Sequence, residues 1–143
     1  MITRPEYPSY GHWIEVGHTS LPENFELRTD GEMGGSGCHH MFGDVKGWFI
    51  SAVAGLRWEE PQNGAYLLTV APHFIEKLTF AEATFDSPAG QIAVRWERQK
   101  NGILLTVTAP ETVAVAAVLP AGYRSETEMP KNGPFAILLN KNA

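Results

Sequence analysis

The sequence predicts an α + β chain in which a short helical region precedes an antiparallel β-sandwich. Composition changes near Pro61, because glycine, histidine and aromatic residues are frequent before it and short apolar runs separated by proline, glycine and asparagine follow it. An apolar stripe of helical period runs from His39 to Leu56. Residues Gln91–Arg98 instead alternate with a period of two, which is typical of a half-buried strand. We therefore predict two domains, residues 1–60 and residues 61–143.

The second region is expected to contain six short strands separated by turns, a pattern that favours a sandwich. Ile92, Val94 and Trp96 share one face of their strand and are candidate core residues. Asn101-Gly102 is a strong hairpin signal between two of the strands. The charged segment Arg124–Lys131 is expected to be a loop. The predicted strands are Tyr66–Val70, Leu78–Phe85, Gln91–Arg98, Ile103–Thr108, Thr112–Leu119 and Phe135–Leu139.

Two helices are expected in the first region. The longer one spans His39–Leu56, with Ser36 as a possible N-cap. A shorter one covers Tyr7–Val16, and Gly17–Cys38 between them is a long loop of the kind that is usually functional. The apolar stripe of the longer helix comprises Phe42, Val45, Phe49, Val53 and Leu56.

This first region lacks a second layer that could cover its apolar side chains. Phe42, Trp48 and Phe49 have no predicted partner within the chain, whereas a stable helix buries its apolar face against another element. We therefore expect that the chain is part of a larger protein. We also expect self-association through the exposed helix face, because large apolar patches tend to find partners.

Composition narrows the possible partners. The formal net charge is −5 and no basic stripe is present, so nucleic acid is not an expected partner. No apolar run approaches the roughly 18 residues that a membrane-spanning helix needs, so no membrane insertion is expected. Cys38 is the only cysteine, which excludes an internal disulfide.

Three segments in order carry a resemblance to a known family. Residues 36–43 read SGCHHMFG and are followed by DVKGWFISAVAGL. Upstream stands PSYGHWIEVGHTSLPENF, and downstream stands VAPHFIEKLTFAEATFDSPAGQIAVRWER. From about Pro8 to Pro120 the chain resembles the bacterial α-L-rhamnosidases of glycoside hydrolase family seventy-eight. It departs from the family pattern at two positions. Pro22 stands where the family often has an aromatic residue, and Cys38 stands where the family often has asparagine.

The resemblance implies a fold and a reaction. It implies the last helices of an (α/α)6 barrel followed by a β-sandwich, and inverting hydrolysis of terminal α-L-rhamnose from glycans or glycosides. Inverting hydrolysis uses one carboxyl group as general acid and another as general base. The resemblance assigns the base to Glu23 and places the acid in a part of the barrel outside this chain, so the chain alone is expected to be inactive.

Several residues allow competing interpretations. Apart from the resemblance, Glu23 would be an exposed loop carboxylate. Glu15 is the competing acidic residue and is interpreted as structural or sugar-contacting. His39 matches the family's histidine in the sugar subsite, although a packed histidine at a helix start is the alternative. Trp13 is the tryptophan expected to face sugar, with core packing an equal alternative. Cys38 is expected to be a buried, inert thiol.

No metal or other cofactor is expected. His39 and His40 are adjacent and would point about 100° apart on a helix, so they cannot readily share an ion. His40 and Asp44 have a suitable spacing, but two ligands are too few for a zinc site. A different function remains open, in which the chain is a non-catalytic β-sandwich module that binds carbohydrate or protein.

Overall fold

The computed structural model of the chain describes residues 2–25, 35–62 and 64–142, without the side chains of Phe42, Glu60 and Gln62. It divides into two compact units, Met1–Lys46 and Gly47–Ala143. Each unit is described by itself below. No described helix is long and apolar enough to cross a membrane.

The first unit begins with helix α1 (Tyr10–Glu15), which is shorter than the predicted Tyr7–Val16. Ser9 is its N-cap, because the hydroxyl oxygen accepts the His12 N–H at 2.9 Å and satisfies one of the free donors of the first turn. Ser9 also donates to the Arg4 carbonyl and is fully buried. The helix therefore starts where its cap is held, three residues after the predicted start.

The predicted helix His39–Leu56 is wrong as a single element. The structure has a 3₁₀ turn η1 (His40–Phe42), a short helix α2 (Asp44–Trp48) and a π-helical segment η2 (Phe49–Ala54). Glycines at 43 and 47 lower helix propensity, and the Ser51 hydroxyl donates to the Gly47 carbonyl at 2.7 Å, which perturbs the backbone ladder. Ser36 is not the cap: His39 stands at that position without a side-chain cap bond.

Gly55 ends η2 in the left-handed conformation, with φ of 86°. A β-carbon there would lie 2.3 Å from the Pro72 nitrogen, so only glycine fits both the conformation and the close approach. The apolar stripe is split at this end. Val53 and Leu56 are buried in the core of the second unit, whereas Phe49 is 41% exposed.

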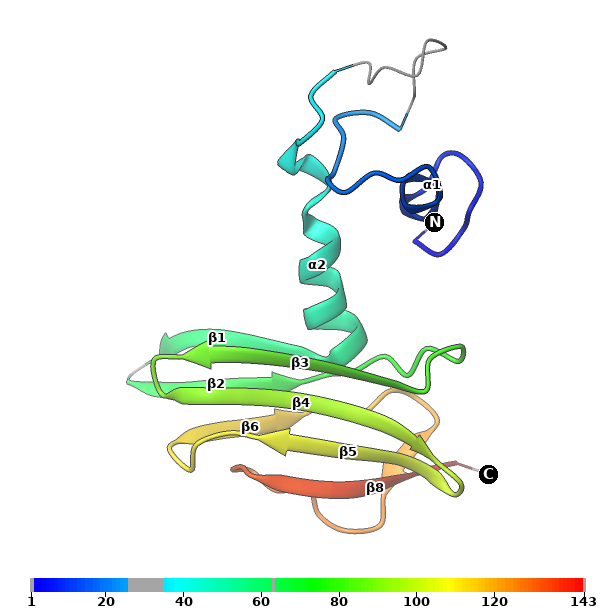
Figure 1. Ribbon diagram of the computed structural model, residues 1–143. Helices are drawn as coiled ribbons and strands as arrows, with labels where there is room; N and C mark the ends of the chain where they lie inside the picture. Colours follow the sequence, from blue (N-terminus) through cyan, green and yellow to red (C-terminus); the bar gives the residue numbers. More distant parts are fainter. Residues whose placement is uncertain (1, 26–34, 63, 143) are drawn as a thin grey trace. The chain divides into compact units, whose positions relative to one another are not determined.

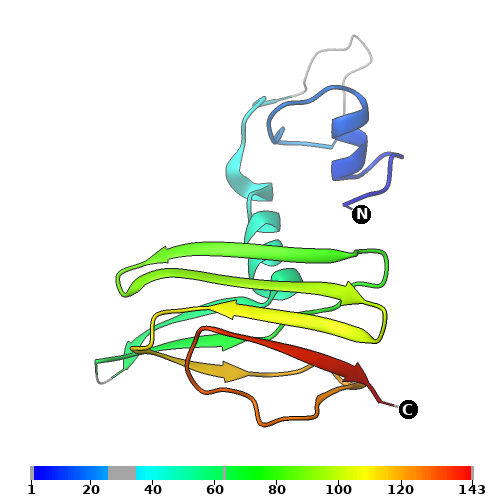
Figure 2. The same cartoon turned by 60° about the horizontal axis from the view of Figure 1, so that its bottom comes forward.

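The second unit is a sandwich of two mostly antiparallel sheets, drawn as two layers in Figures 1 and 2. The three-stranded sheet has the order β1-β2-β6, with β1 (Leu56–Gln62), β2 (Ala65–Val70) and β6 (Val113–Ala117). The five-stranded sheet has the order β3-β4-β5-β8-β7, with β3 (Phe80–Ser87), β4 (Gly90–Gln99), β5 (Gly102–Thr108), β8 (Phe135–Lys141) and β7 (Tyr123–Ser125).

All six predicted strands are present, with ends that shift by one or two residues. The expectation of an all-antiparallel sandwich is wrong at one pair, because β2 and β6 run parallel with Leu68 opposite Val115. The strands between them in sequence belong to the other sheet, so the chain returns to β2 by crossing between layers. Two strands were not predicted: β1, and β7, which takes up Arg124 and Ser125 of the expected loop.

The core of the second unit lies between the two sheets and closes around η2. Ile92, Val94 and Trp96 are fully buried, which confirms the predicted inward face of β4. The Trp96 indole Nε1 donates to the Val53 carbonyl at 2.7 Å, which fixes the end of η2 to the centre of β4. Burial of this apolar face supplies the main stabilisation of the unit.

The hairpin between β4 and β5 turns one residue earlier than predicted. Gln99 pairs with Gly102, so Lys100 and Asn101 occupy the turn in place of Asn101-Gly102. Gly102 has another constraint, because a β-carbon there would lie 2.2 Å from the Leu139 carbonyl oxygen on β8. Glycine is needed at position 102 because β5 and β8 approach closely there, more than for the geometry of the turn.

Candidate functional site

Two loop segments of the first unit are held side by side in an antiparallel pair. The Glu23 N–H donates to the Ser36 carbonyl at 2.9 Å, and the His39 N–H donates to the Leu21 carbonyl at 2.7 Å. The Ser20 hydroxyl also donates to the Gly37 carbonyl. These bonds join residues 13 to 18 positions apart in the sequence and bring the Glu23 segment against the His39 segment.

The Glu23 carboxylate is fixed at this pairing. Its Oε2 accepts the Ser36 backbone N–H at 3.0 Å and lies 4.0 Å from the His39 Nδ1. The two side chains are 39% and 37% exposed. A β-carbon at Gly35 would lie 2.7 Å from Oε2, so glycine at that position leaves room for the carboxylate. The two residues to which the resemblance assigns roles, Glu23 and His39, thus lie next to each other in the structure.

This pair can do acid–base chemistry. A carboxylate held by one backbone donor and partly open to solvent keeps an oxygen free for water, and the Oε1 atom has no partner among the described residues. The neighbouring imidazole can donate or accept a hydrogen bond. The arrangement is therefore suited to taking a proton from a water molecule.

Trp13 packs among other aromatic side chains of the first unit. Its indole stacks on Phe25 with ring centroids 4.4 Å apart and meets Tyr10 edge to face at 5.3 Å. Only 2% of Trp13 is exposed, so in this structure its ring is packed as a core residue would be. A sugar-stacking role for Trp13 stays a prediction.

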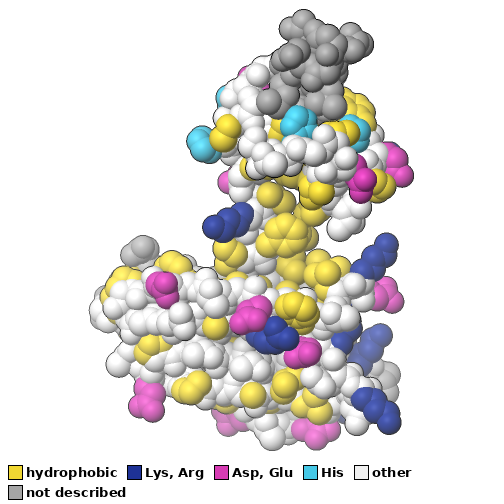
Figure 3. All heavy atoms as spheres, in the orientation of Figure 1, with side chains coloured by type: hydrophobic (Ala, Val, Ile, Leu, Met, Phe, Trp, Pro, Cys, Tyr) yellow, Lys and Arg dark blue, Asp and Glu magenta, His cyan; other side chains and the backbone are white. Residues whose placement is uncertain are grey.

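Sequence reasoning missed a small pocket beside Trp13. It has a volume of about 260 Å³, and polar residues of the loop, among them His18 and Ser20, line it together with aromatic side chains. Figure 3 shows several histidine side chains at the surface of this unit. The sequence signal that could have indicated it is the polar run His18–Ser20, which is separated from the end of α1 by two residues. The lining residues are Tyr10, Trp13, Ile14, His18, Thr19, Ser20 and Leu21.

The thiol of Cys38 was predicted to be buried, and this is wrong, because Cys38 is exposed. The Ser36 hydroxyl accepts the Cys38 N–H and donates to the Cys38 carbonyl, and this tight turn directs the segment outward.

Glu15 is exposed at the end of α1, and its carboxylate forms no hydrogen bond or ion pair with the described residues. Among the described residues, no three His, Cys, Asp or Glu side chains are placed to share a metal ion.

Comparison with known families matches both parts of the chain. The family model described as the bacterial alpha-L-rhamnosidase C-terminal domain matches residues 55–134, and the model described as the bacterial alpha-L-rhamnosidase 6 hairpin glycosidase domain matches residues 1–53. Comparison with curated proteins gave no significant match.

Three solved α-L-rhamnosidase structures have a fold similar to that of nearly the whole chain. The α-L-rhamnosidase from Dictyoglumus thermophilum superposes with a TM-score of 0.74 at 25% identity, over 99% of this chain and 17% of that one. The Streptomyces avermitilis enzyme, solved with L-rhamnose, gives 0.70 at 22% identity, over 99% and 15%. The Aspergillus terreus enzyme gives 0.71 at 20% identity, over 98% and 16%. The chain thus spans less than one fifth of each of these proteins.

Both matched models describe domains of bacterial α-L-rhamnosidases, and one of them covers more than half of the chain. The chain belongs to the bacterial α-L-rhamnosidase family, as the resemblance in its sequence predicted. The assignment of residues 1–60 and 61–143 to two domains stays a prediction, as do the roles of Glu23, His39 and Trp13.

Proposed function

We propose that this chain is the C-terminal part of an enzyme that hydrolyses terminal α-L-rhamnose with inversion, and that Glu23 is its general base. The observation that supports this most directly is the carboxylate of Glu23, held by the Ser36 N–H beside the His39 imidazole. The match of residues 1–53 to a glycosidase domain supports a catalytic origin for this unit. Rhamnose as the sugar follows from the family and from the L-rhamnose in the Streptomyces avermitilis structure.

A water molecule attacks the anomeric carbon of rhamnose while Glu23 takes its proton, and the bond to the leaving oxygen breaks. A carboxylic acid from outside this chain gives its proton to the leaving oxygen. His39 then serves to position the sugar or the water, since its Nδ1 lies within 4.0 Å of the base.

The chain alone is expected not to hydrolyse an aryl α-L-rhamnoside above background. General acid and general base assistance each supply about 10²–10⁴ in rate, and only the base is proposed to lie in this chain. A chromogenic assay of the purified chain, next to a full-length family enzyme as positive control, measures this. Turnover that copurifies with the chain and disappears in Glu23→Gln would contradict the proposal that the acid lies elsewhere.

We further propose that residues 1–53 derive from the end of a helical catalytic barrel. The described helices are short, and apolar side chains that a barrel would cover are exposed: Trp48 is 45% exposed and Phe49 is 41% exposed. The two rings contact each other edge to face at 5.3 Å and form one apolar patch.

Self-association through this patch is expected at sub-millimolar concentration, because water leaves such surfaces when two copies meet. Sedimentation equilibrium should show a mass that rises with concentration, and Trp48→Ser with Phe49→Ser should abolish the rise. Leu138→Ser is the matched control, since Leu138 is 42% exposed on β8. A monomer at every concentration, or equal loss in the control, would contradict the role of the patch.

A further inference from the structure

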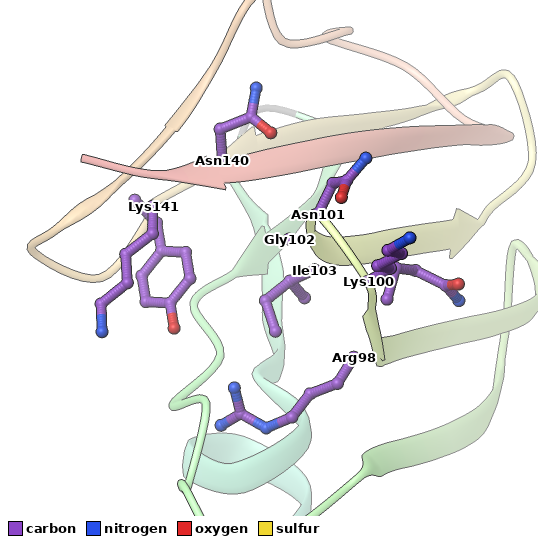
Figure 4. Close-up of a pocket in the computed structure, with 9 residues that line it drawn as sticks. Arg98, Lys100, Asn101, Gly102, Ile103, Asn140 and Lys141 are labelled. Atoms are coloured by element: carbon purple, nitrogen blue, oxygen red, sulfur yellow. The ribbon is translucent and has the colours of Figure 1, made fainter. Parts of the chain in front are cut away.

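A second and larger pocket opens on the sandwich unit, where the β4–β5 hairpin meets β8 (Figure 4). Its volume is about 520 Å³, within the range of small-molecule sites. Three of its lining residues are cationic, namely Arg98, Lys100 and Lys141, and none is acidic. The chain as a whole carries a formal charge of −5, so this concentration of positive charge is local.

Arg98 is held rigidly at the base of this pocket. Its Nε donates to the Leu78 carbonyl at 2.9 Å, and one terminal nitrogen donates to the Phe74 and Ile75 carbonyls, each at 3.0 Å. The other terminal nitrogen has no partner among the described residues. The guanidinium is thus oriented before any ligand arrives and retains donors, which reduces the entropy cost of binding.

Among the described residues, no carboxylate forms an ion pair within 4 Å of Arg98, Lys100 or Lys141. Arg95, on the other face of β4, shows the contrast, because it bonds Glu82 at 2.9 Å and Glu97 at 3.1 Å. Figure 4 shows the Arg98 and Lys141 side chains extending toward the same side of the pocket. Two cations that have no carboxylate partner among the described residues favour an anionic ligand.

The rest of the lining is suited to a sugar. Three side-chain amides, of Gln99, Asn101 and Asn140, can bond hydroxyl groups, and Tyr123 contributes a half-buried ring. Asn140 donates to Glu126 at 2.7 Å, so one of its amide hydrogens is already used while its carbonyl oxygen remains available. Inorganic phosphate would need the cations but neither the amides nor the ring.

We propose that this pocket is a glycan subsite that binds a sugar carrying a carboxylate, such as a uronic acid unit. The carboxylate is bound by the cations of Arg98 and Lys141, Lys100 adds a third positive charge to the lining, and the hydroxyl groups are bound by the amides. The inference rests on the proposed function only in taking a glycan as the polymer that the parent enzyme meets. It gives the sandwich a binding role that is separate from Glu23.

The test is a titration of the 143-residue chain, followed by amide NMR, with tetragalacturonate and with a galactose tetramer as the uncharged match. We expect shifts at residues 98–103 and 139–141 with tetragalacturonate alone, and weaker binding at high salt. Lys100→Gln with Lys141→Gln should weaken binding at least about tenfold, because a charge-assisted bond to the carboxylate and a neighbouring positive charge are both lost. Lys77→Gln with Arg124→Gln removes the same charge outside the pocket lining and should leave binding unchanged.

Three results would overturn the proposal: no shifts at the pocket, equal weakening in the Lys77 and Arg124 control, or phosphate binding as tightly as the tetramer. The last would make the pocket a simple anion site. Because no hydrolysis is measured, the outcome is independent of whether Glu23 is the base. Arg98 is left unchanged in these variants because its bonds to three carbonyls also hold the loop before β3.

Discussion

Glu23→Gln in the full-length parent enzyme is expected to lower kcat by about two to four orders of magnitude and to leave folding intact. Glutamine keeps the shape of the side chain, and its carbonyl oxygen can still accept the Ser36 N–H that Oε2 accepts at 3.0 Å. What disappears is the ability to take a proton from water. Steady-state kinetics on an aryl α-L-rhamnoside, with circular dichroism to verify the fold, measures both parts of the expectation.

Glu15→Gln is the matched control for this variant. Glu15 is exposed at the end of α1, so its loss removes the same charge without touching the Glu23–His39 pair. It should retain near-normal kcat. If Glu23→Gln had near-normal kcat and Glu15→Gln had a lowered kcat, the base assignment would move to Glu15.

His39→Ala should raise KM more than it lowers kcat, because the imidazole is proposed to position substrate and not to carry the proton.

The strands could be predicted from sequence because period-two alternation survives wherever one face is buried. Ile92, Val94 and Trp96 are the clearest case. Strand β1 was not predicted because it contains Pro61 and two glutamates, residues that are uncommon in strands. The structure explains why proline is tolerated in β1. This strand is at the edge of its sheet, where a missing N–H can face outward.

The parallel β2–β6 pair and the broken helix could not be predicted by local pattern. Which strand lies next to β2 depends on how the two layers close around the core, and on contacts distant in sequence. The His39–Leu56 stripe has a helical period, but its last members, Val53 and Leu56, serve the core of the sandwich. The period of the stripe therefore did not show that Val53 and Leu56 are buried in the sandwich while Phe49 is 41% exposed.

The site was predictable only in part. The roles of Glu23 and His39 came from the resemblance, and their proximity depends on backbone bonds between Leu21–Glu23 and Ser36–His39 that no local pattern indicates. The pocket of Arg98 was missed for a different reason. Its three cations come from β4, the hairpin turn and β8, and they gather only once β5 pairs with β8.

Trp96→Ala is expected to destabilise the sandwich by about 3–5 kcal/mol, the range for emptying a large aromatic site in a core. Trp96 is fully buried, and Phe74 meets it edge to face at 5.4 Å. Since small domains have about 5–15 kcal/mol of stability, this variant should lose a large share of it. Urea unfolding with an unchanged m value measures the loss.

Trp96→Phe separates packing from hydrogen bonding. Phenylalanine fills most of the space but leaves the Val53 carbonyl, which accepts the indole N–H at 2.7 Å, without its buried donor. We expect a loss of about 1–3 kcal/mol, the cost of an unsatisfied buried polar group. Trp48→Ala, at a ring that is 45% exposed, is the control and should lose less than about 1 kcal/mol. If Trp96→Ala also lost less than that, the attachment of η2 to β4 through this indole would not hold the core together.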